Sequence, residues 1–337
     1  MNFFHVLSQN FIGYFIYTIY SLIVVHYSII LSKRFNVIDY PKTKRKIHKT
    51  PTPLIGFFYF LLTFFIILIW LLYSYNLSYK LIFSFIFGLL FNSFVGLIDD
   101  KSSLTANSRI VIFIIIFSVS ISLNDTFLIQ TVRSDLIDSK IILSFSFAFT
   151  FTILCYLLLL NSLNLSDGIN GLAILIAIIW LSIISIFSSK LFQLINFLLV
   201  INLLILLVFN LKSKIFLGSS GINFIATYIC FITVFTFNFS NNLMYEHIFL
   251  LFMIPGVDMM RVFFMRIFSG KNPFTPDKNH FHHLLIKRYD LFKSLLIYFS
   301  LILIPILFFL FQKNYVIYLI LGEFILYCLI IKRLSAK

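Results

Sequence analysis

Residues 80–98 read KLIFSFIFGLLFNSFVGLI, an apolar run that is followed at once by Asp99 and Asp100. A helix of about 20 apolar residues crosses the roughly 30 Å hydrocarbon core of a bilayer, so this run predicts a membrane-spanning helix. Similar runs recur at 11–32, 53–73, 108–124, 141–160, 169–188, 191–209, 222–238, 244–260, 294–312 and 315–332. The sequence therefore predicts an all-α, polytopic integral membrane protein with about eleven transmembrane helices.

The composition indicates one membrane domain. Apolar residues make up 61% of the 337 residues and charged residues only 11%, whereas about 25% charged residues is usual in soluble domains. The mean hydropathy is +1.02. Because the stretches between apolar runs are short, we expect residues 1–337 to form a single membrane-embedded domain. Cysteines fall only inside apolar runs, where they are expected to be packing residues and not disulfide partners.

The distribution of Lys and Arg predicts which face is cytoplasmic. If the apolar runs alternate across the membrane, 21 of the 26 basic residues lie on the face that contains residues 33–49. The opposite face has Lys80, Arg133, Lys140, Lys190 and Lys313. This asymmetry predicts a plasma (inner) membrane protein with its N-terminus outside and its C-terminus in the cytoplasm. The net charge of +14 is thus explained by topology or by anionic substrates and headgroups, and nucleic-acid binding is not expected.

The adjacent carboxylates Asp99 and Asp100 end the third predicted helix on the cytoplasmic side. Two neighbouring carboxylates repel each other unless a proton or a cation is shared, so the pair indicates a metal or acid–base site. An ordinary solvated helix end is the alternative.

Amide and carboxylate side chains recur at three-residue spacing in Asn161, Asn164, Asp167 and Asn170. In a helical turn this spacing places the first three on one face, where they can converge on a polar ligand or a metal. A turn built from Asn, Asp and Gly is the simpler interpretation that stays open.

Three histidines, His280, His282 and His283, fall within four positions of the longest cytoplasmic loop, 261–293. Arg261 and Arg266 belong to the same loop. No cysteine lies nearby and the spacing matches no closed structural zinc site, so contact with phosphate or sugar fits better than zinc. A merely solvated loop remains a further alternative.

Two more segments on this face are basic or glycine-rich. The first contains Arg45, Lys46 and His48, and the second runs from Asn210 to Gly218-Ser219-Ser220-Gly221. Together the five segments predict a cytoplasmic site for an acidic, phosphorylated substrate and a hard cation.

In order, these segments resemble the motifs of the polyprenyl-phosphate N-acetylhexosamine-1-phosphate transferases, glycosyltransferase family 4. That pattern has an Arg-Lys-x-His block, a Gly-x-x-Asp-Asp helix end, an Asn-x-x-Asp-Gly-x-Asp/Asn-Gly loop, a Phe-x-Gly-Asp-x-Gly turn and a His-x-His-His loop. The resemblance covers about residues 39 to 283. The matching residues are Arg45, Lys46, His48, Asp99, Asp100, Asn164, Asp167, Asn170, His280, His282 and His283.

The fourth block departs from the family pattern. Ser219 stands where the pattern has an aspartate that serves as a metal ligand. Mg²⁺ often needs only one or two carboxylates plus substrate phosphates, so the departure puts the rate in doubt and not the fold. A smaller departure is Phe57, where a second glycine often follows Gly56.

The resemblance implies transfer of N-acetylhexosamine 1-phosphate from a UDP-sugar such as UDP-N-acetylglucosamine to polyprenyl (undecaprenyl) phosphate, an early membrane step of cell-envelope glycan synthesis. It implies Mg²⁺, or Mn²⁺ in its place, and a homodimer as a further expected partnership. The implied catalytic residues are Asp99, Asp100 and Asp167, and the metal positions are Asp100, Asp167 and Ser219. The implied substrate-binding residues are Arg45, Lys46, His48, Asn161, Asn164, Asn170, Asn210, Arg261, Arg266, His280, His282 and His283.

Two alternatives belong to other classes of protein. A transporter or flippase for a phosphorylated lipid would place charged groups near the bilayer midplane, where Glu323 is the one candidate. A relative that binds its ligands without turnover would be consistent with Ser219.

Overall fold

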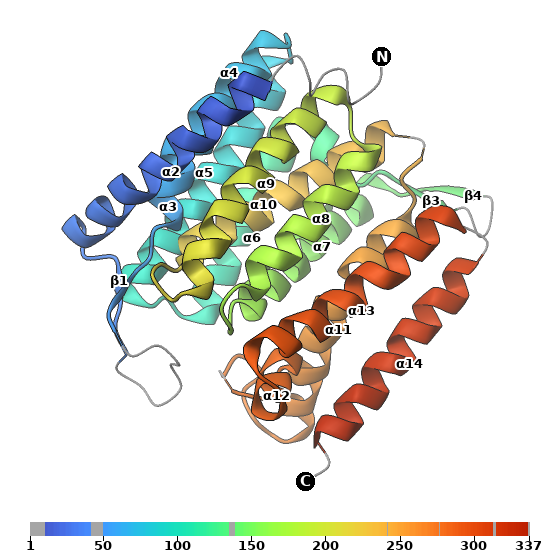
Figure 1. Cartoon of the computed structure of the whole chain (residues 1–337). Helices are drawn as coiled ribbons and strands as arrows, with labels where there is room; N and C mark the ends of the chain where they lie inside the picture. Colours follow the sequence, from blue (N-terminus) through green and yellow to red (C-terminus); the bar gives the residue numbers. More distant parts are fainter. Residues whose placement is uncertain are drawn as a thin grey trace.

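The computed structural model describes residues 11–41, 50–134, 139–240, 242–275, 277–312 and 315–335. They form a bundle of long helices with a short β-hairpin at each of two opposite ends (Figure 1). The helices are α2 (Phe11–Arg34), α3 (Gly56–Phe60), α4 (Ile66–Ser74), α5 (Tyr79–Ser102), α6 (Ala106–Leu123), α7 (Phe145–Ser166), α8 (Leu172–Phe187), α9 (Lys190–Leu211), α10 (Gly218–Phe239), α11 (Tyr245–Phe268), α12 (Phe281–Arg288), α13 (Leu291–Phe311) and α14 (Val316–Ser335). The antiparallel hairpins pair β1 (Ile38–Asp39) with β2 (Thr52–Pro53), and β3 (Thr131–Ser134) with β4 (Ser139–Ile142).

Each predicted membrane span coincides with a helix. Within the described ranges, nine helical segments are long and apolar enough to cross a membrane, and one of them joins α3 and α4 through a π-helical turn, Leu61–Phe65. The other two predicted spans correspond to α8, which has 16 residues, and α14, which carries Lys332 and Arg333 in its last turn. The polytopic all-α fold is confirmed, whereas the count of eleven and the orientation of the termini stay predictions.

Several predicted boundaries were wrong. Helices α5, α7 and α11 continue past residues 98, 160 and 260 to Ser102, Ser166 and Phe268. Arg261 and Arg266 therefore lie on α11 and not in a loop. Apolarity reports how far a helix lies in hydrocarbon, and a helix can continue beyond that depth with polar side chains.

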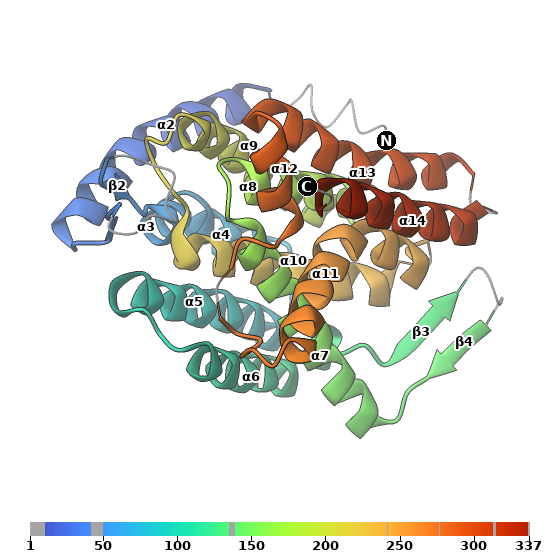
Figure 2. The ribbon, with the colours of Figure 1, turned by 90° about the horizontal axis from the view of Figure 1, so that it is seen from below.

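The segment 218–221, predicted as a turn, is the first turn of α10. This helix lies in the middle of the bundle (Figure 2), and 83% of its most apolar stretch is buried, against at most 56% in the other candidate spans. Gly96 on α5 and Gly56 on α3 allow close approach, because a Cβ on either would collide with the backbone around Leu217–Gly221. The start of α10 is therefore held between α3 and α5, beside Asp99 and Asp100.

Candidate active site

Asp100 binds the N-terminus of α10. Its Oδ1 accepts a hydrogen bond from the Ser219 backbone N–H at 2.7 Å, and its Oδ2 accepts from the Ser220 N–H at 3.1 Å and the Ser220 hydroxyl at 2.8 Å. A helix N-terminus presents unpaired N–H groups and a positive dipole end, which stabilise an anion. Gly218 makes this approach possible, since its φ is +72° and a Cβ there would lie 2.5 Å from Asp100 Oδ2.

Asp99 is held by three donors. Its Oδ1 accepts from the Leu104 N–H at 2.9 Å, and its Oδ2 accepts from Arg109 Nη1 at 2.9 Å and from the Ser219 hydroxyl at 2.8 Å. The Arg109 ion pair was missed from the sequence, where Arg109 counted only toward the charge of a loop. A carboxylate with this many donors is fixed in place, so the geometry favours a positioning role for Asp99 over proton abstraction.

Asp167 follows the last residue of α7, as the three-residue spacing predicted for a helical segment. The side chain is accessible to solvent, yet enough protein surrounds it that burial, reinforced by Asp100 and Asp39, raises its pKa to about 7. The mutual repulsion means that Asp39, Asp100 and Asp167 lie close enough for their charges to interact.

The neighbouring amides fasten this turn to the segment before α10. Asn210 Oδ1 accepts from the Gly171 N–H at 2.6 Å, and its Nδ2 donates to the Ile215 carbonyl at 3.1 Å. Asn170 Nδ2 donates to Ser213 Oγ at 2.7 Å. Asn161 Nδ2 bonds the Leu157 carbonyl within its own helix at 2.7 Å. These bonds give Asn170 and Asn210 a structural role, while their predicted substrate contacts stay predictions.

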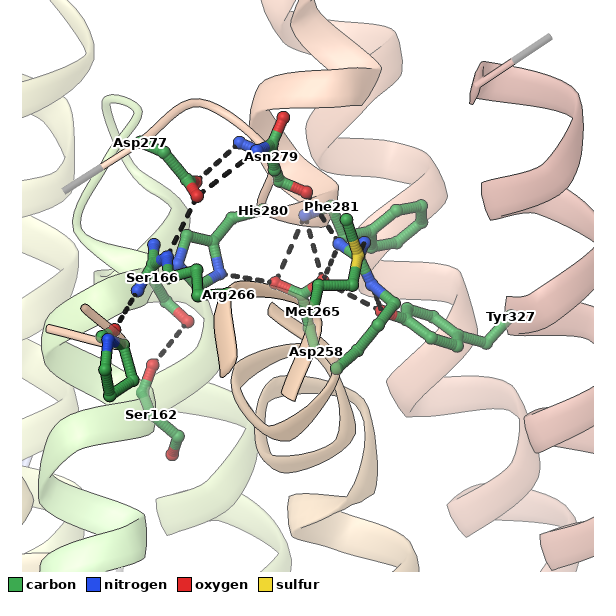
Figure 3. Close-up of polar contacts among 12 residues, drawn as sticks. Ser162, Ser166, Asp258, Met265, Arg266, Asp277, Asn279, His280, Phe281 and Tyr327 are labelled. Carbon is green, nitrogen blue, oxygen red and sulfur yellow. Dashed lines mark hydrogen bonds and ion pairs between the residues drawn. The ribbon is translucent and has the colours of Figure 1, made fainter. Parts of the chain in front are cut away.

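Asp258 on α11 organises the histidine loop, and it is the centre of the contacts in Figure 3. Its Oδ2 lies 2.9 Å from His280 Nδ1, and both its oxygens accept from the Phe281 N–H. Its Oδ1 also accepts from Tyr327 on α14 and from Arg261, each at 2.8 Å. Asp258 was not predicted as a site residue, although its spacing of three residues to Arg261 is a visible helical pair.

Arg266 holds the other side of the loop. Its Nε donates to Asp277 Oδ2 at 2.9 Å and its Nη1 to the Pro273 carbonyl at 2.6 Å. Burial acts against ionisation of Asp277, but the hydrogen bonds from Arg266 and Asn279 and the charge of Arg266 together outweigh it and lower the pKa of this carboxyl. Arg261 likewise donates to the Asn279 carbonyl at 2.6 Å. The two arginines therefore fix the path of the loop in addition to any substrate contact.

His282 packs directly on the Asp167 turn. Its Nε2 occupies the space that a Cβ on Gly168 would need. Burial lowers the pKa of His282 to about 3, so the imidazole is neutral near pH 7. The His280 and His282 rings stack at 5.8 Å, and Nε2 of each is buried without a hydrogen-bond partner among the described residues. Two unpaired imidazole nitrogens beside Asp167 are suited to a polar ligand.

Arg45, Lys46 and His48, predicted to bind substrate, lie outside the described residues. The β1–β2 pair on either side of them is described, with Asp39 opposite Thr52. Just after β2, the Ile55 and Gly56 N–H groups donate to the carbonyls of Phe216 and Leu217 at 3.0 and 3.1 Å. The segment that follows β2 is thereby joined to the residues just before α10.

An apolar groove of about 770 Å³ leads to this site between α7, α10, α11 and α14. Its lining runs from Val132 on β3 and Tyr245 to Arg261 and Phe264 at the other end of α11. Ser162 on α7 lines it one turn before Ser166. All three cysteines, Cys155, Cys230 and Cys328, line it as well. The groove therefore ends beside the Asp167 turn and the histidine loop.

Asp100 and Asp167 are suited to a hard cation, because their carboxylates repel each other and no described lysine or arginine hydrogen-bonds Asp100. In the part of the chain that the structure describes, no group of three or more His, Cys, Asp or Glu side chains could ligate a metal together. Ser219 turns its hydroxyl to Asp99. A cation would therefore need further ligands from substrate phosphates or water.

The fold and the site define a polytopic helical membrane protein with a cluster of aspartates and histidines at one end of an apolar groove. Residues 82–237 match the model of glycosyl transferase family 4. This part of the chain is similar to that family, in agreement with the resemblance that the motifs indicated.

Similar proteins carry one name. The undecaprenyl-phosphate alpha-N-acetylglucosaminyl 1-phosphate transferase of Thermotoga maritima is 33% identical over 177 residues, which cover 50% of this chain and 54% of that protein. The protein of the same name from Escherichia coli K12 is 23% identical over 271 residues, 76% of this chain and 71% of its own length. The chain thus spans about half the length of the Thermotoga relative and more of the Escherichia coli one.

Proposed function

We propose that the chain transfers N-acetylhexosamine 1-phosphate from a UDP-sugar to polyprenyl phosphate on the cytoplasmic face of the plasma membrane. One arrangement carries the proposal: the histidine loop packs on Gly168, next to Asp167, and Arg261, which bonds that loop, lines an apolar groove. A long hydrocarbon with a phosphate at one end fits that combination. The names of the similar proteins support the same reaction.

The groove supports the lipid half of the proposal. Its lining is apolar except for a few hydroxyl, thiol and phenol groups and Arg261, which lies toward the end next to the histidine loop. A polyprenyl tail would lie along the groove and bring its phosphate to that end. Burial of the tail supplies binding free energy that does not depend on the phosphate.

In the proposed reaction, a phosphate oxygen of the lipid attacks the β-phosphorus of the UDP-sugar. A new P–O–P link forms, the bond from the β-phosphorus to the bridging oxygen breaks, and UMP leaves with that oxygen. Both reactants are anions, so charge repulsion opposes the attack. Mg²⁺ held by Asp100, Asp167 and the diphosphate would supply the positive charge that lowers this repulsion.

The chain's own residues would place the reactants. Asp99, fixed by Arg109, keeps Ser219 and the start of α10 against α5. The Nε2 atoms of His280 and His282 would hydrogen-bond the nucleotide or sugar. Because His282 is neutral near pH 7, its contribution is a hydrogen bond and not a charge.

One observation favours a second candidate, a relative that binds both ligands without turnover. Ser219 uses its hydroxyl on Asp99 and offers no carboxylate to a cation. A flippase is less well supported, because the described lining of the groove contains no row of polar side chains along which a phosphate could cross. Glu323, the residue that would favour a transporter, is buried with neither carboxylate oxygen hydrogen-bonded to a described residue, and it does not line the groove.

Transfer of radiolabelled sugar phosphate from UDP-N-acetylglucosamine to undecaprenyl phosphate tests the proposal, with the purified protein in nanodiscs and with Mg²⁺ or EDTA. We expect labelled lipid and free UMP only with the metal. Binding of both ligands without labelled lipid at any Mg²⁺ concentration would establish the binding-only alternative. Movement of labelled lipid between leaflets without transfer would establish a flippase.

A further inference from the structure

Arg261 and Tyr327 belong to two features at once. Both line the apolar groove, and both bind Asp258, which holds His280 and the Phe281 N–H. The groove and the histidine loop are therefore joined by three consecutive hydrogen-bonded side chains. Tyr327 is 1% exposed and Asp258 4%, so water competes little for these contacts.

The guanidinium of Arg261 is only partly used by the protein. Its Nε donates to the Tyr327 hydroxyl at 2.8 Å, and its Nη2 donates to Asp258 Oδ1 at 2.8 Å and to the Asn279 carbonyl at 2.6 Å. Its Nη1 contacts the Met265 thioether at 3.3 Å. Because a thioether is a weak acceptor, Nη1 keeps its capacity for an anion.

The position of Arg261 suits the phosphate of a lipid. Among the described residues that line the groove, it alone carries a full charge at pH 7, and it lies at the end next to the histidine loop. An apolar tail in the groove would thus place an anionic head beside Nη1. The side chain is 18% exposed, which leaves the guanidinium accessible from the groove while limiting competition from water.

We propose that Arg261 binds the phosphate of the lipid carrier and transmits its presence to the nucleotide side through Asp258 and Asn279, with Tyr327 as the positioning residue. The inference rests on the proposed function. It assigns a coupling between the two substrates and not another step of the chemistry.

The coupling follows from shared ordering. A phosphate on Nη1 immobilises the guanidinium. The Nη2 of the same guanidinium holds Asp258, which contacts His280, and the carbonyl of Asn279, the residue before His280. The loop that presents His280 and His282 is then already ordered when the nucleotide arrives, so nucleotide binding loses less conformational entropy. Linkage is reciprocal, and couplings of this kind change affinity by about 5-fold to 150-fold.

The test measures UMP affinity by calorimetry in nanodiscs with and without undecaprenyl phosphate. UMP carries no sugar phosphate to transfer, so no turnover disturbs the titration. For the unaltered protein we expect undecaprenyl phosphate to tighten UMP binding at least about fivefold. Undecaprenol-loaded nanodiscs, which supply the same apolar chain without its phosphate, should not change UMP affinity.

Two variants separate coupling from simple structural damage. Tyr327→Phe removes the hydroxyl that orients Arg261, so we expect the effect of the lipid on UMP affinity to fall below about twofold. Arg261→Lys should lose the lipid effect, because a single ammonium nitrogen cannot replace Nη1 facing the phosphate and Nη2 facing Asp258 and Asn279. Tyr318→Phe is the matched control, since Tyr318 lies on the same helix and is 72% exposed.

The outcomes distinguish this inference from the proposed function. If the unaltered protein binds UMP and undecaprenyl phosphate but neither affects the other, the coupling is refuted and the proposed function stands. A full lipid effect in Tyr327→Phe and Arg261→Lys would also refute it. Failure of the unaltered protein to bind either ligand would refute both.

Discussion

The substitution Ser219→Asp restores the carboxylate of the family pattern, and the structure shows what it would meet. Ser219 Oγ lies 2.8 Å from Asp99 Oδ2 and its N–H lies 2.7 Å from Asp100 Oδ1. An aspartate there would bring a third carboxylate next to two others. We therefore expect Ser219→Asp to make both stability and activity depend on Mg²⁺.

Without Mg²⁺, two effects lower the free energy of unfolding of Ser219→Asp. The hydrogen bond from Ser219 to a charged acceptor contributes about 1.5–3 kcal/mol, and two like charges about 4 Å apart repel by about 4 kcal/mol at an effective dielectric constant of 20. Arg109 and the α10 N-terminus offset part of this, the helix end by about 0.3–1 kcal/mol. The free energy of unfolding without Mg²⁺ should fall by at least about 2 kcal/mol.

With Mg²⁺ the substitution should instead raise the free energy of unfolding, because a hard cation between carboxylates replaces their repulsion with attraction. Transfer of sugar phosphate should rise at least about tenfold over the unaltered protein, the low end of what lost metal contacts cost. The assays are thermal unfolding in detergent and labelled-lipid formation, each across a Mg²⁺ titration. Ser219→Asn, neutral and similar in shape to aspartate, should gain neither property. Equal melting and equal rates for Ser219→Asp and the unaltered protein would show that Ser219 is not at a metal site.

Three further predictions concern the site and the topology. Asp167→Asn should lower sugar-phosphate transfer at least about 100-fold while the protein still folds in detergent. The control Asp125→Asn, which lies outside the site, should change neither transfer nor folding. Near-normal turnover of Asp167→Asn would show that Asp167 is not part of the site. His282 has a pKa of about 3 in the folded chain against an ordinary 6.5, so below pH 6.5 the unfolded chain takes up a proton that the folded chain does not. Its contribution to stability should fall by about 2 kcal/mol from pH 7.5 to pH 5, and His282→Gln should lose that part of the pH dependence of unfolding; an identical pH dependence in both proteins would contradict the burial. Cysteine tags in 126–139 should react with impermeant reagents from outside and tags in 269–280 only from inside, and the reverse for the second group would overturn the cytoplasmic site.

The sequence predicts which parts of the chain are helical because apolar runs of about 20 residues have one common solution in a bilayer. It predicts the ends of those helices less well. Asp99, Asn164 and Arg266 all lie on helices that outlast their apolar run, and nothing in hydropathy marks where a helix stops once it leaves the hydrocarbon. The glycine-rich start of α10 was likewise predicted as a turn, because its residues are not apolar and hydropathy does not mark it as helical.

The predicted site residues fall into two groups in the structure. His282 packs against Gly168, next to Asp167, and the charge of Asp100 contributes to the raised pKa of Asp167. Asn210 and Arg266 are occupied by backbone carbonyls and a loop aspartate. An amide or a guanidinium offers the same donors to a ligand and to the protein, so residue type alone cannot separate the two uses.

The site residues that were not predicted from the sequence contact residues that are far away in the sequence. Asp258 bonds His280, 22 residues later, and Tyr327, 69 residues later on another helix. The pairing of Asp258 with Arg261 could be read from their spacing, but the loop that Asp258 holds depends on the path of residues 269–280. Tyr327 is one of 17 tyrosines, and nothing in its local sequence sets it apart.

The charges around Ser219 indicate how the chain has adapted to the missing aspartate. Asp99 is balanced by Arg109 and by the Ser219 hydroxyl, and Asp100 by the α10 N-terminus and Ser220. Burial raises the pKa of Asp167, and the charges of its neighbours Asp100 and Asp39 raise it further. A cation bound at Asp167 would therefore depend on ligands that arrive with the diphosphate. The affinity of the unaltered protein for Mg²⁺ should therefore be weak without a UDP-sugar and rise when one is present. In Ser219→Asp the affinity for Mg²⁺ should be substantial with and without the UDP-sugar.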